Sequence, residues 1–140
     1  MLAATPGALS VGMGHTEVPL TFRNISGSTC RLSGYPAVAA LDGSGQVAAH
    51  ASPVASGYSG GLAAGSTPPV IDLAPGQQAT AQIEDTDNPT GNATTCPSYA
   101  ALLVTPPGQS DAMRVDLVAA ISDCSGLEVN PLIAGTTGRS

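Results

Sequence analysis

Residues 24–36 read NISGSTCRLSGYP, and this stretch decides the fold class of the chain. Before it, the apolar residues Val18, Leu20 and Phe22 are spaced two apart, and a second apolar run at 38–41 follows it directly. Polar and glycine residues between two such runs are typical of a strand, a tight turn and a second strand of an antiparallel sheet. The turn at residues 24–27 (Asn-Ile-Ser-Gly) supplies residues that tolerate positive φ and that form local side-chain hydrogen bonds.

The composition favours many short strands and excludes two classes of partner. The 17 glycines and 12 prolines in 140 residues are frequent breaks, and no long amphipathic helix is indicated. The formal net charge is −6, the chain has no lysine, and its four arginines are scattered. Nucleic acid and anionic membrane surfaces are therefore not expected partners, because both bind clustered cations.

Turn signals recur at nearly regular spacing along the chain. Residues 42–45 (Asp-Gly-Ser-Gly) predict one hairpin, 75–76 (Pro-Gly) predict a type II turn, and 106–111 predict the loop of another hairpin. About eight or nine short strands result, which predicts an all-β antiparallel sandwich. We expect a single domain over residues 1–134, with residues 135–140 as a flexible tail.

Two of the three cysteines flank the second predicted hairpin. Its strands, 102–105 and 113–121, fold back on each other, which places Cys96 and Cys124 together at the open end. A disulfide is the preferred interpretation, and two separate buried thiols are the alternative. A disulfide implies an oxidising compartment, so an extracytoplasmic location is expected. The third cysteine, Cys30, is expected to be a small buried residue at the start of a strand.

The beginning of the chain contains neither the basic region nor the apolar region of a signal peptide. No apolar run is long enough to form a transmembrane segment. The chain is therefore either cytosolic or the mature part of an exported protein with an added initiator methionine, and the cysteines favour the exported protein.

The same segments resemble a family of exported actinobacterial proteins whose shared domain is of unknown function. The resemblance covers residues 9–133, and its most specific element is the Cys-x-Leu-x-Gly-Tyr-Pro motif that begins at Cys30. The other matching segments are 20–24, 26–27, 73–76 with Ala79, Cys96, 102–107 and 124–131.

This resemblance implies an extracytoplasmic, immunoglobulin-like β-sandwich that is secreted or attached to the cell envelope as a lipoprotein. Similar domains also occur beside membrane-spanning segments of larger proteins. The resemblance implies no catalytic or ligand-binding residues. The lipid-attachment cysteine that such proteins often carry near the start is not found here, so a lipid anchor would lie outside this chain.

Carboxylates gather at Glu84, Asp85 and Asp87, directly after the predicted strand 79–83. Ca²⁺ prefers several carboxylate and carbonyl oxygens from one flexible loop, so these residues are a weak calcium candidate. Their spacing fits no EF-hand and no glycine lies among them, so a solvated acidic turn is the default interpretation. No other metal and no cofactor is indicated.

Residues 52–69 form a long connection with few side chains to bury. A connection of this length inside a compact domain is typically mobile or functional. Loops on a rigid sandwich often carry recognition, so Val54, Tyr58 and Leu62 are the candidate interaction residues.

No Gly-x-Ser-x-Gly motif lies on a strand-to-helix elbow, so neither His15 nor His50 is assigned to a nucleophile triad. We therefore predict a non-enzymatic binding module at the bacterial cell envelope, with an unknown envelope protein or ligand as its partner. The alternative is an extracellular sensor or accessory domain of a larger membrane-anchored receptor, such as a kinase. A hydrolase that uses one of the histidines is the less favoured alternative.

Overall fold

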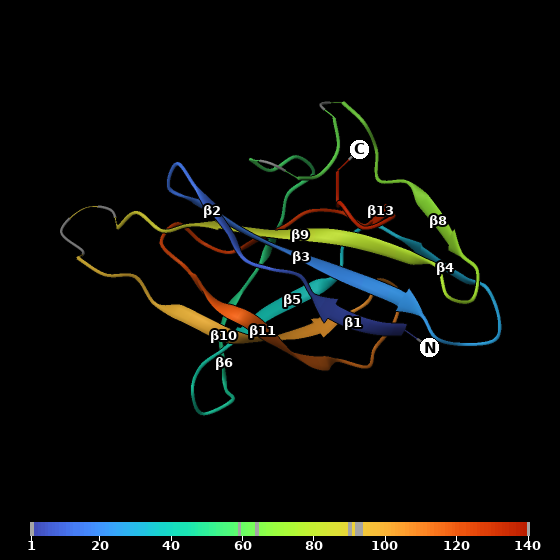
Figure 1. The fold of residues 1–140 in the computed structure, drawn as a ribbon, viewed down its shortest axis with the longest axis horizontal. Coiled ribbons are helices and arrows are strands. Elements are labelled where there is room, and N and C mark those ends of the chain that lie inside the picture. Colours follow the sequence, from blue (N-terminus) through green and yellow to red (C-terminus); the bar gives the residue numbers. More distant parts are fainter. Residues whose placement is uncertain (1, 59, 64, 90, 92–93, 140) are drawn as a thin grey trace.

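The spacing of Val18, Leu20 and Phe22 produces the central strand β3 (His15–Asn24) of a β-sandwich (Figure 1). A computed structural model describes residues 2–58, 60–63, 65–89, 91 and 94–139. Within these residues the protein is all-β, with thirteen strands and no helix. The fold class is confirmed, although more strands form than the eight or nine expected from the turn signals.

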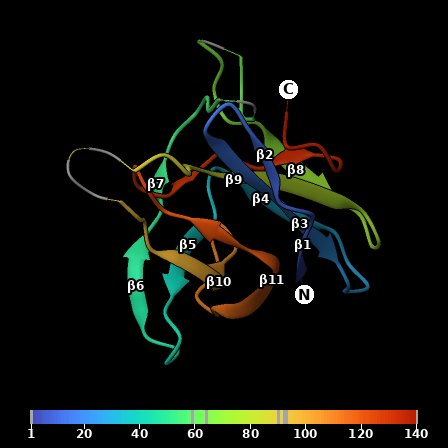
Figure 2. The ribbon, with the colours of Figure 1, turned by 60° about the vertical axis from the view of Figure 1, so that its left-hand side comes forward.

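Two sheets form the layers of the sandwich, and a short strand pair closes one end (Figure 2). The seven-stranded sheet contains β1 (Leu2–Pro6), β2 (Ser10–Gly12), β3, β7 (Ser52–Pro53), β9 (Gln78–Thr86), β12 (Glu128–Val129) and β13 (Ile133–Ala134). The four-stranded sheet contains β5 (Ala37–Leu41), β6 (Val47–His50), β10 (Ser98–Thr105) and β11 (Met113–Ser122). The remaining pair is β4 (Cys30–Ser33) with β8 (Val70–Leu73).

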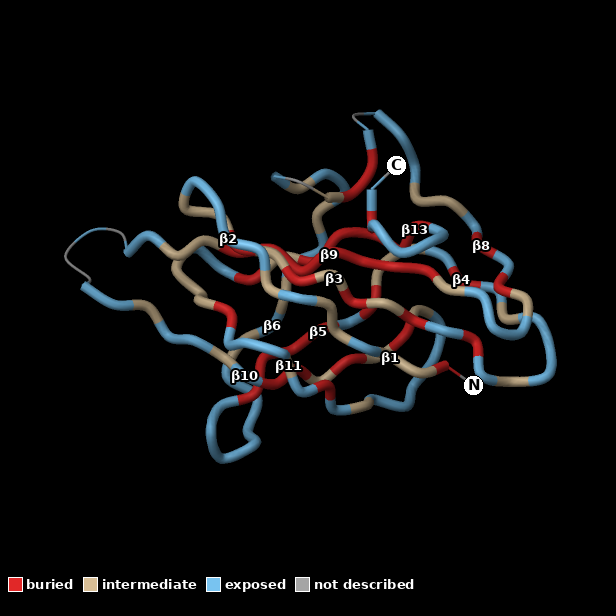
Figure 3. The backbone as a smooth tube through the Cα atoms, viewed as in Figure 1, coloured by how far each residue is buried: buried red, intermediate tan, exposed pale blue. Residues whose placement is uncertain are grey.

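The core lies between the inner faces of the two sheets, along β3, β9, β5 and β10 (Figure 3). Leu20 and Phe22 of β3 are fully buried, as are Leu102 and Val104 of β10 on the facing sheet. Each such side chain contributes roughly 1.5–3 kcal/mol of hydrophobic stabilisation on burial. Small aliphatic side chains fill most of this core, in keeping with the chain's aromatic content of only 3%.

The stretch 24–36 joins the two layers and does not form a simple hairpin. β3 lies in the seven-stranded sheet and β5 in the four-stranded sheet, so the expected antiparallel pairing of the flanking strands is wrong. Within the stretch, β4 pairs with β8, and Arg31 forms an ion pair with Asp72 at 2.8 Å. Gly34, with φ of +87°, interrupts the chain between β4 and β5.

Asn24 organises the turn that opens this stretch. Its side chain is 1% exposed, and its amide donates hydrogen bonds to the carbonyl oxygens of Ser28 (2.7 Å) and Leu73 (2.8 Å). Its Oδ1 accepts from the backbone N–H of Ser26 at 2.9 Å and from the Ser26 hydroxyl at 2.7 Å. The expected local side-chain hydrogen bonds are confirmed, whereas positive φ within the turn is not needed.

Three other turn predictions are confirmed. β5 and β6 form the hairpin around residues 42–45, and β10 and β11 form the hairpin around 106–111. Gly76 has φ of +86°, and the N–H of Gln77 donates to the carbonyl of Ala74 at 2.9 Å, which closes the predicted turn.

Cys96 and Cys124 form the predicted disulfide, with their Cα atoms 5.1 Å apart. Ser98 pairs with Ser122 in the hairpin, so Cys96 and Cys124 lie opposite each other two positions further along the same register. Cys30 is a half-buried free thiol at the start of β4 and packs against the core.

Residues 135–139 lie against the outer face of β9, although the sequence favoured a flexible tail. The Thr80 hydroxyl donates to the carbonyl of Gly135 at 2.8 Å, and the Gln82 amide donates to the carbonyl of Thr137 at 2.7 Å. Arg139 forms an ion pair with Glu17 of β3 at 3.0 Å. The seven-stranded sheet is thus covered on both faces, by the apolar core on one side and by polar contacts on the other.

We predict that Asn24→Ala lowers the free energy of unfolding by about 2 kcal/mol, because it leaves buried carbonyl groups without donors. Ile25→Ala is the matched control, since Ile25 is the next residue and is 62% exposed. It should change stability by less than about 0.5 kcal/mol. Urea denaturation measures both values, and equal losses for the two variants would contradict the role given to Asn24.

Replacing both Cys96 and Cys124 with serine should lower the free energy of unfolding by about 3 kcal/mol, because the disulfide closes a loop of 28 residues. Cys30→Ser retains the disulfide and is expected to have a much smaller effect. Thermal unfolding under non-reducing conditions compares the variants. A double variant as stable as Cys30→Ser would show that the disulfide contributes little.

Candidate functional site

β9 continues past Ile83 to Thr86, so Glu84 and Asp85 lie within a strand. Both are only 4% exposed, and the default interpretation of a solvated acidic turn is therefore wrong for them. Neighbouring residues of a strand face opposite sides of a sheet, so the two carboxylates are directed away from each other. Asp87 follows the strand, and its N–H donates to the carbonyl of Gly14 at 3.0 Å.

These carboxylates do not gather into one cation site. Across the described residues, no group of three or more His, Cys, Asp or Glu side chains lies close enough together to hold a metal ion. Glu84 instead contacts the long connection on the outer face of the sheet, and Asp85 contacts the segment after β11.

The Glu84 carboxylate binds the long connection to the outer face of β9. It accepts hydrogen bonds from the backbone N–H of Tyr58 at 2.7 Å and of Gly60 at 3.1 Å. Hydrogen bonds to an ionised carboxylate are stronger than those between neutral groups, which offsets the cost of burying the charge. The connection around Tyr58 is therefore attached to the sheet through main-chain groups.

Two glycines allow this close approach. A side chain at Gly57 would overlap the Glu84 carboxylate, and a Cβ at Gly60 would lie 2.6 Å from Oδ1 of Asn130. Asn130 is fully buried, and its amide donates to the carbonyl of Val54 at 3.1 Å. The backbone of this connection thus rests directly on the sheet.

Asp85 lies at the end of the core, next to the disulfide. Its Oδ1 accepts from the N–H of Thr86 at 2.7 Å and of Ser125 at 3.2 Å. Burial, and next the neighbouring Asp123 carboxyl, raise the pKa of Asp85 to about 6. Its Oδ2 is buried and has no hydrogen-bond partner in the described part of the chain.

The hairpin between β2 and β3 ends in an unusual turn. Gly12 pairs with His15, so Met13 and Gly14 form a two-residue loop, with φ of +52° and +80°. Positive φ at both central positions defines a type I′ turn, which normally contains Asn, Asp or Gly. Methionine at positive φ is strained. Met13 is also 90% exposed, so its side chain adds nothing to the core that would offset this strain.

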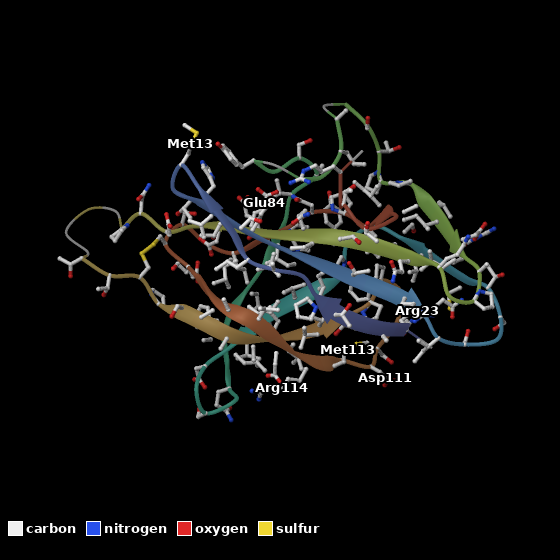
Figure 4. The ribbon with its side chains drawn as sticks, in the orientation of Figure 1. Met13, Arg23, Glu84, Asp111, Met113 and Arg114 are labelled. Carbon is white, nitrogen blue, oxygen red and sulfur yellow. A yellow bond between two sulfur atoms is a disulfide. The ribbon has the colours of Figure 1, made fainter. Side chains whose placement is uncertain are left out.

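Exposed apolar side chains surround this turn. Val11 is 59% exposed and Tyr58 is 58% exposed. The Tyr58 ring stacks on the His15 ring with 3.6 Å between centroids, and the Tyr58 hydroxyl donates to Met13 Sδ at 3.6 Å. We name these four residues, Val11, Met13, His15 and Tyr58, the hairpin-tip surface. Figure 4 shows Met13 at the tip of the hairpin, with Glu84 on the strand beneath it.

Two grooves border the stacked rings of His15 and Tyr58. One has a volume of about 230 Å³ and is lined mainly by the β2–β3 hairpin, including Val11 and Met13. The other has a volume of about 430 Å³ and includes Ser56, Ser125 and Glu128 in its lining. Glu84 contributes to both grooves, so the carboxylate that binds the connection also lies beside the two possible binding volumes.

The structure separates the three predicted interaction residues. Tyr58 is exposed as expected, Val54 is half-buried, and Leu62 is buried, being only 7% exposed. The prediction that Leu62 contacts a partner is therefore wrong, because its side chain is buried. Its N–H donates to the carbonyl of Ala55 at 2.8 Å. Sequence reasoning missed Val11 and Met13, since methionine is not a residue expected in a tight hairpin turn.

The layered arrangement and the disulfide define an all-β sandwich domain. The chain belongs to the family described as Domain of unknown function (DUF4232), which matches residues 2–132. The expected membership of an unknown-function domain family is confirmed. No curated protein and no solved structure matches the chain. In the residues that the structure describes, no helix has the length and apolar character to cross a membrane.

We predict that Met13→Asn raises the free energy of unfolding by about 1 kcal/mol, because asparagine adopts positive φ with less strain. Met13→Leu is the matched control, since leucine keeps an apolar side chain and the same backbone strain. Chemical denaturation should show a gain for Met13→Asn only. An equal gain in stability for Met13→Leu would show that relief of backbone strain in the turn is not the cause of the gain.

The raised pKa of Asp85 predicts a change in pH dependence. Between the ordinary value of 3.8 and about 6, the folded protein retains a proton that the unfolded chain has released. Stability from this group is therefore lost as the pH rises through that range. Asp85→Asn should lose less stability than the parent between pH 4 and pH 7, as measured by urea denaturation.

Asp111→Asn, in the exposed hairpin loop, is the control for this pH series. It should reproduce the pH profile of the parent. If Asp85→Asn and the parent give parallel profiles, Asp85 does not take up a proton on folding.

Proposed function

We propose that this protein is a non-enzymatic, extracytoplasmic binding module of the bacterial cell envelope, which recognises its partner through the hairpin-tip surface. The observation that carries the proposal is Met13, an exposed apolar side chain at positive φ. Strained residues that do not serve packing often lie at functional positions. Methionine is also well suited to contact a partner, because its side chain is flexible and polarisable.

Tyr58 supports the same assignment. Its backbone is attached through Glu84 and its ring rests on His15, so a large amphipathic side chain is held in place while 58% exposed. Aromatic side chains with few accessible rotamers lose little entropy on binding and are frequent at interfaces. A binding role uses both features, rigid support and exposed apolar area.

Separate observations support the proposed location and the proposed non-enzymatic role. The Cys96–Cys124 disulfide favours an oxidising compartment outside the cytoplasm. Among the described residues, the His15 ring stacks on the Tyr58 ring and forms no hydrogen bond to a serine or a carboxylate, which favours a role in packing over one as a catalytic base. The same surface would serve a sensor domain of a larger receptor, which shares the test below.

The proposal predicts that Met13→Asp and Tyr58→Ala each reduce capture of an envelope component by about tenfold or more. The purified domain, immobilised on beads, is incubated with envelope extract, and retained material is quantified. Val70→Asp is the matched control, because Val70 is 64% exposed on β8 at the other end of the sandwich. Thermal unfolding confirms that each variant is folded.

Capture that is unchanged in both hairpin-tip variants would overturn the assigned surface. Capture that depends only on Val70 would place the binding face at the opposite end of the molecule.

A further inference from the structure

The groove that contains Glu128 is acidic, and no described residue neutralises the Glu128 carboxylate. Glu17, Glu84 and Glu128 are direct cross-strand neighbours on β3, β9 and β12. Like charges in directly opposite positions of a sheet repel each other. Arg139 pairs with Glu17, and backbone amides bind Glu84. The half-buried Glu128 carboxylate has no hydrogen bond or ion pair within the described residues.

An aromatic ring forms part of the same groove. Tyr58 lines the space together with Glu84 and Glu128, and the ring is 58% exposed. Carboxylates beside an aromatic ring favour a cation, through ion pairing and through attraction to the ring face. An ammonium or guanidinium group therefore suits this groove, whereas an anionic group would be repelled.

The strand β2, which lines the apolar groove on the other side of the stacked rings, lies at an edge of the seven-stranded sheet. Within the described residues β2 pairs only with β3, so its second edge is open. Protected edges usually carry charged residues or proline, and Ser10, Val11 and Gly12 are neither. β3 and β9 separate this strand from β12, so an occupant that contacts both the hairpin tip and Glu128 has to cross the outer face of the sheet, which suits an extended segment.

We propose that the occupant is an extended polypeptide segment that carries an apolar side chain close to a lysine or arginine. The apolar side chain contacts Val11 and Met13, and the cationic side chain lies against Glu128 and Tyr58. This inference rests on the proposed function and specifies its partner. A second copy of the chain is a poor occupant, because it has no lysine and three of its four arginines form internal ion pairs.

The test uses fluorescent peptides of the form Ser-Gly-X-(Gly)n-Z-Gly-Ser, in which zero to two glycines separate the variable positions. X is Leu, Phe, Ser or Glu, and Z is Arg, Lys, citrulline or Glu. Citrulline keeps the shape of arginine without its charge. Fluorescence anisotropy with the purified domain measures each affinity at two salt concentrations.

We expect the strongest binding when X is Leu or Phe and Z is Arg or Lys. Citrulline in place of arginine, and serine in place of leucine, should each weaken binding by about tenfold or more. Higher salt should weaken the arginine peptides and have little effect on the citrulline peptides.

Two variants of the protein separate the two contacts. Glu128→Gln should remove the preference for arginine over citrulline and retain the preference for leucine over serine. Met13→Asp should weaken the preference for leucine and retain the preference for a cation. Val70→Asp, the distant exposed control, should retain both preferences.

Equal binding of arginine and citrulline peptides, or a preference for glutamate, would overturn the inference. Binding to vesicles of zwitterionic or anionic phospholipid without peptide preference would show that the occupant is a lipid surface. Concentration-dependent self-association would show that the occupant is a second copy of the chain. If envelope capture still depends on Met13 when no peptide preference is found, only the partner class is wrong. If capture is also independent of Met13, the proposed function itself fails.

Discussion

The hydrogen bonds from the backbone of Tyr58 and Gly60 to the buried Glu84 carboxylate are the contact on which the candidate site depends. A buried carboxylate is unfavourable without hydrogen-bond donors, and a long connection is mobile without attachment. The backbone N–H groups of the connection supply the donors, and the Glu84 carboxylate supplies the attachment. The attachment places the Tyr58 ring on His15 and beside Met13. A surface that is ordered before a partner arrives loses less entropy when it binds.

β9 connects this surface to the rest of the fold. Its inner face contributes Ile83 to the core, while its outer face bears Glu84, Gln82 and Thr80, which bind the long connection and the last residues of the chain. At the end of β9, the N–H of Cys124 donates to the carbonyl of Thr86 at 3.2 Å. The disulfide-linked hairpin of one sheet is thereby joined to β9 of the other sheet, at the same end as the hairpin-tip surface.

Local signals predicted the hairpins and the disulfide, because a turn and the register beside it depend on residues close in sequence. The separation of β3 and β5 into different sheets depends on distant pairing and was not predictable from the turn between them. Glu84 was expected to be exposed because acidic residues usually are. It is buried because residues distant in the sequence cover it, which local sequence does not indicate. The hairpin tip was missed because Met13 adopts a backbone conformation that methionine rarely takes.

Amide hydrogen exchange measured by NMR tests most directly whether Glu84 holds the long connection in place. In the parent, the N–H groups of Tyr58 and Gly60 should exchange slowly, and in Glu84→Gln both should exchange at least about tenfold faster. The N–H of Gly135, which donates to the carbonyl of Gln78 at 2.9 Å, should keep its protection and serves as the internal reference. Fast exchange at Tyr58 and Gly60 in the parent itself would contradict a preformed surface and the account built on it.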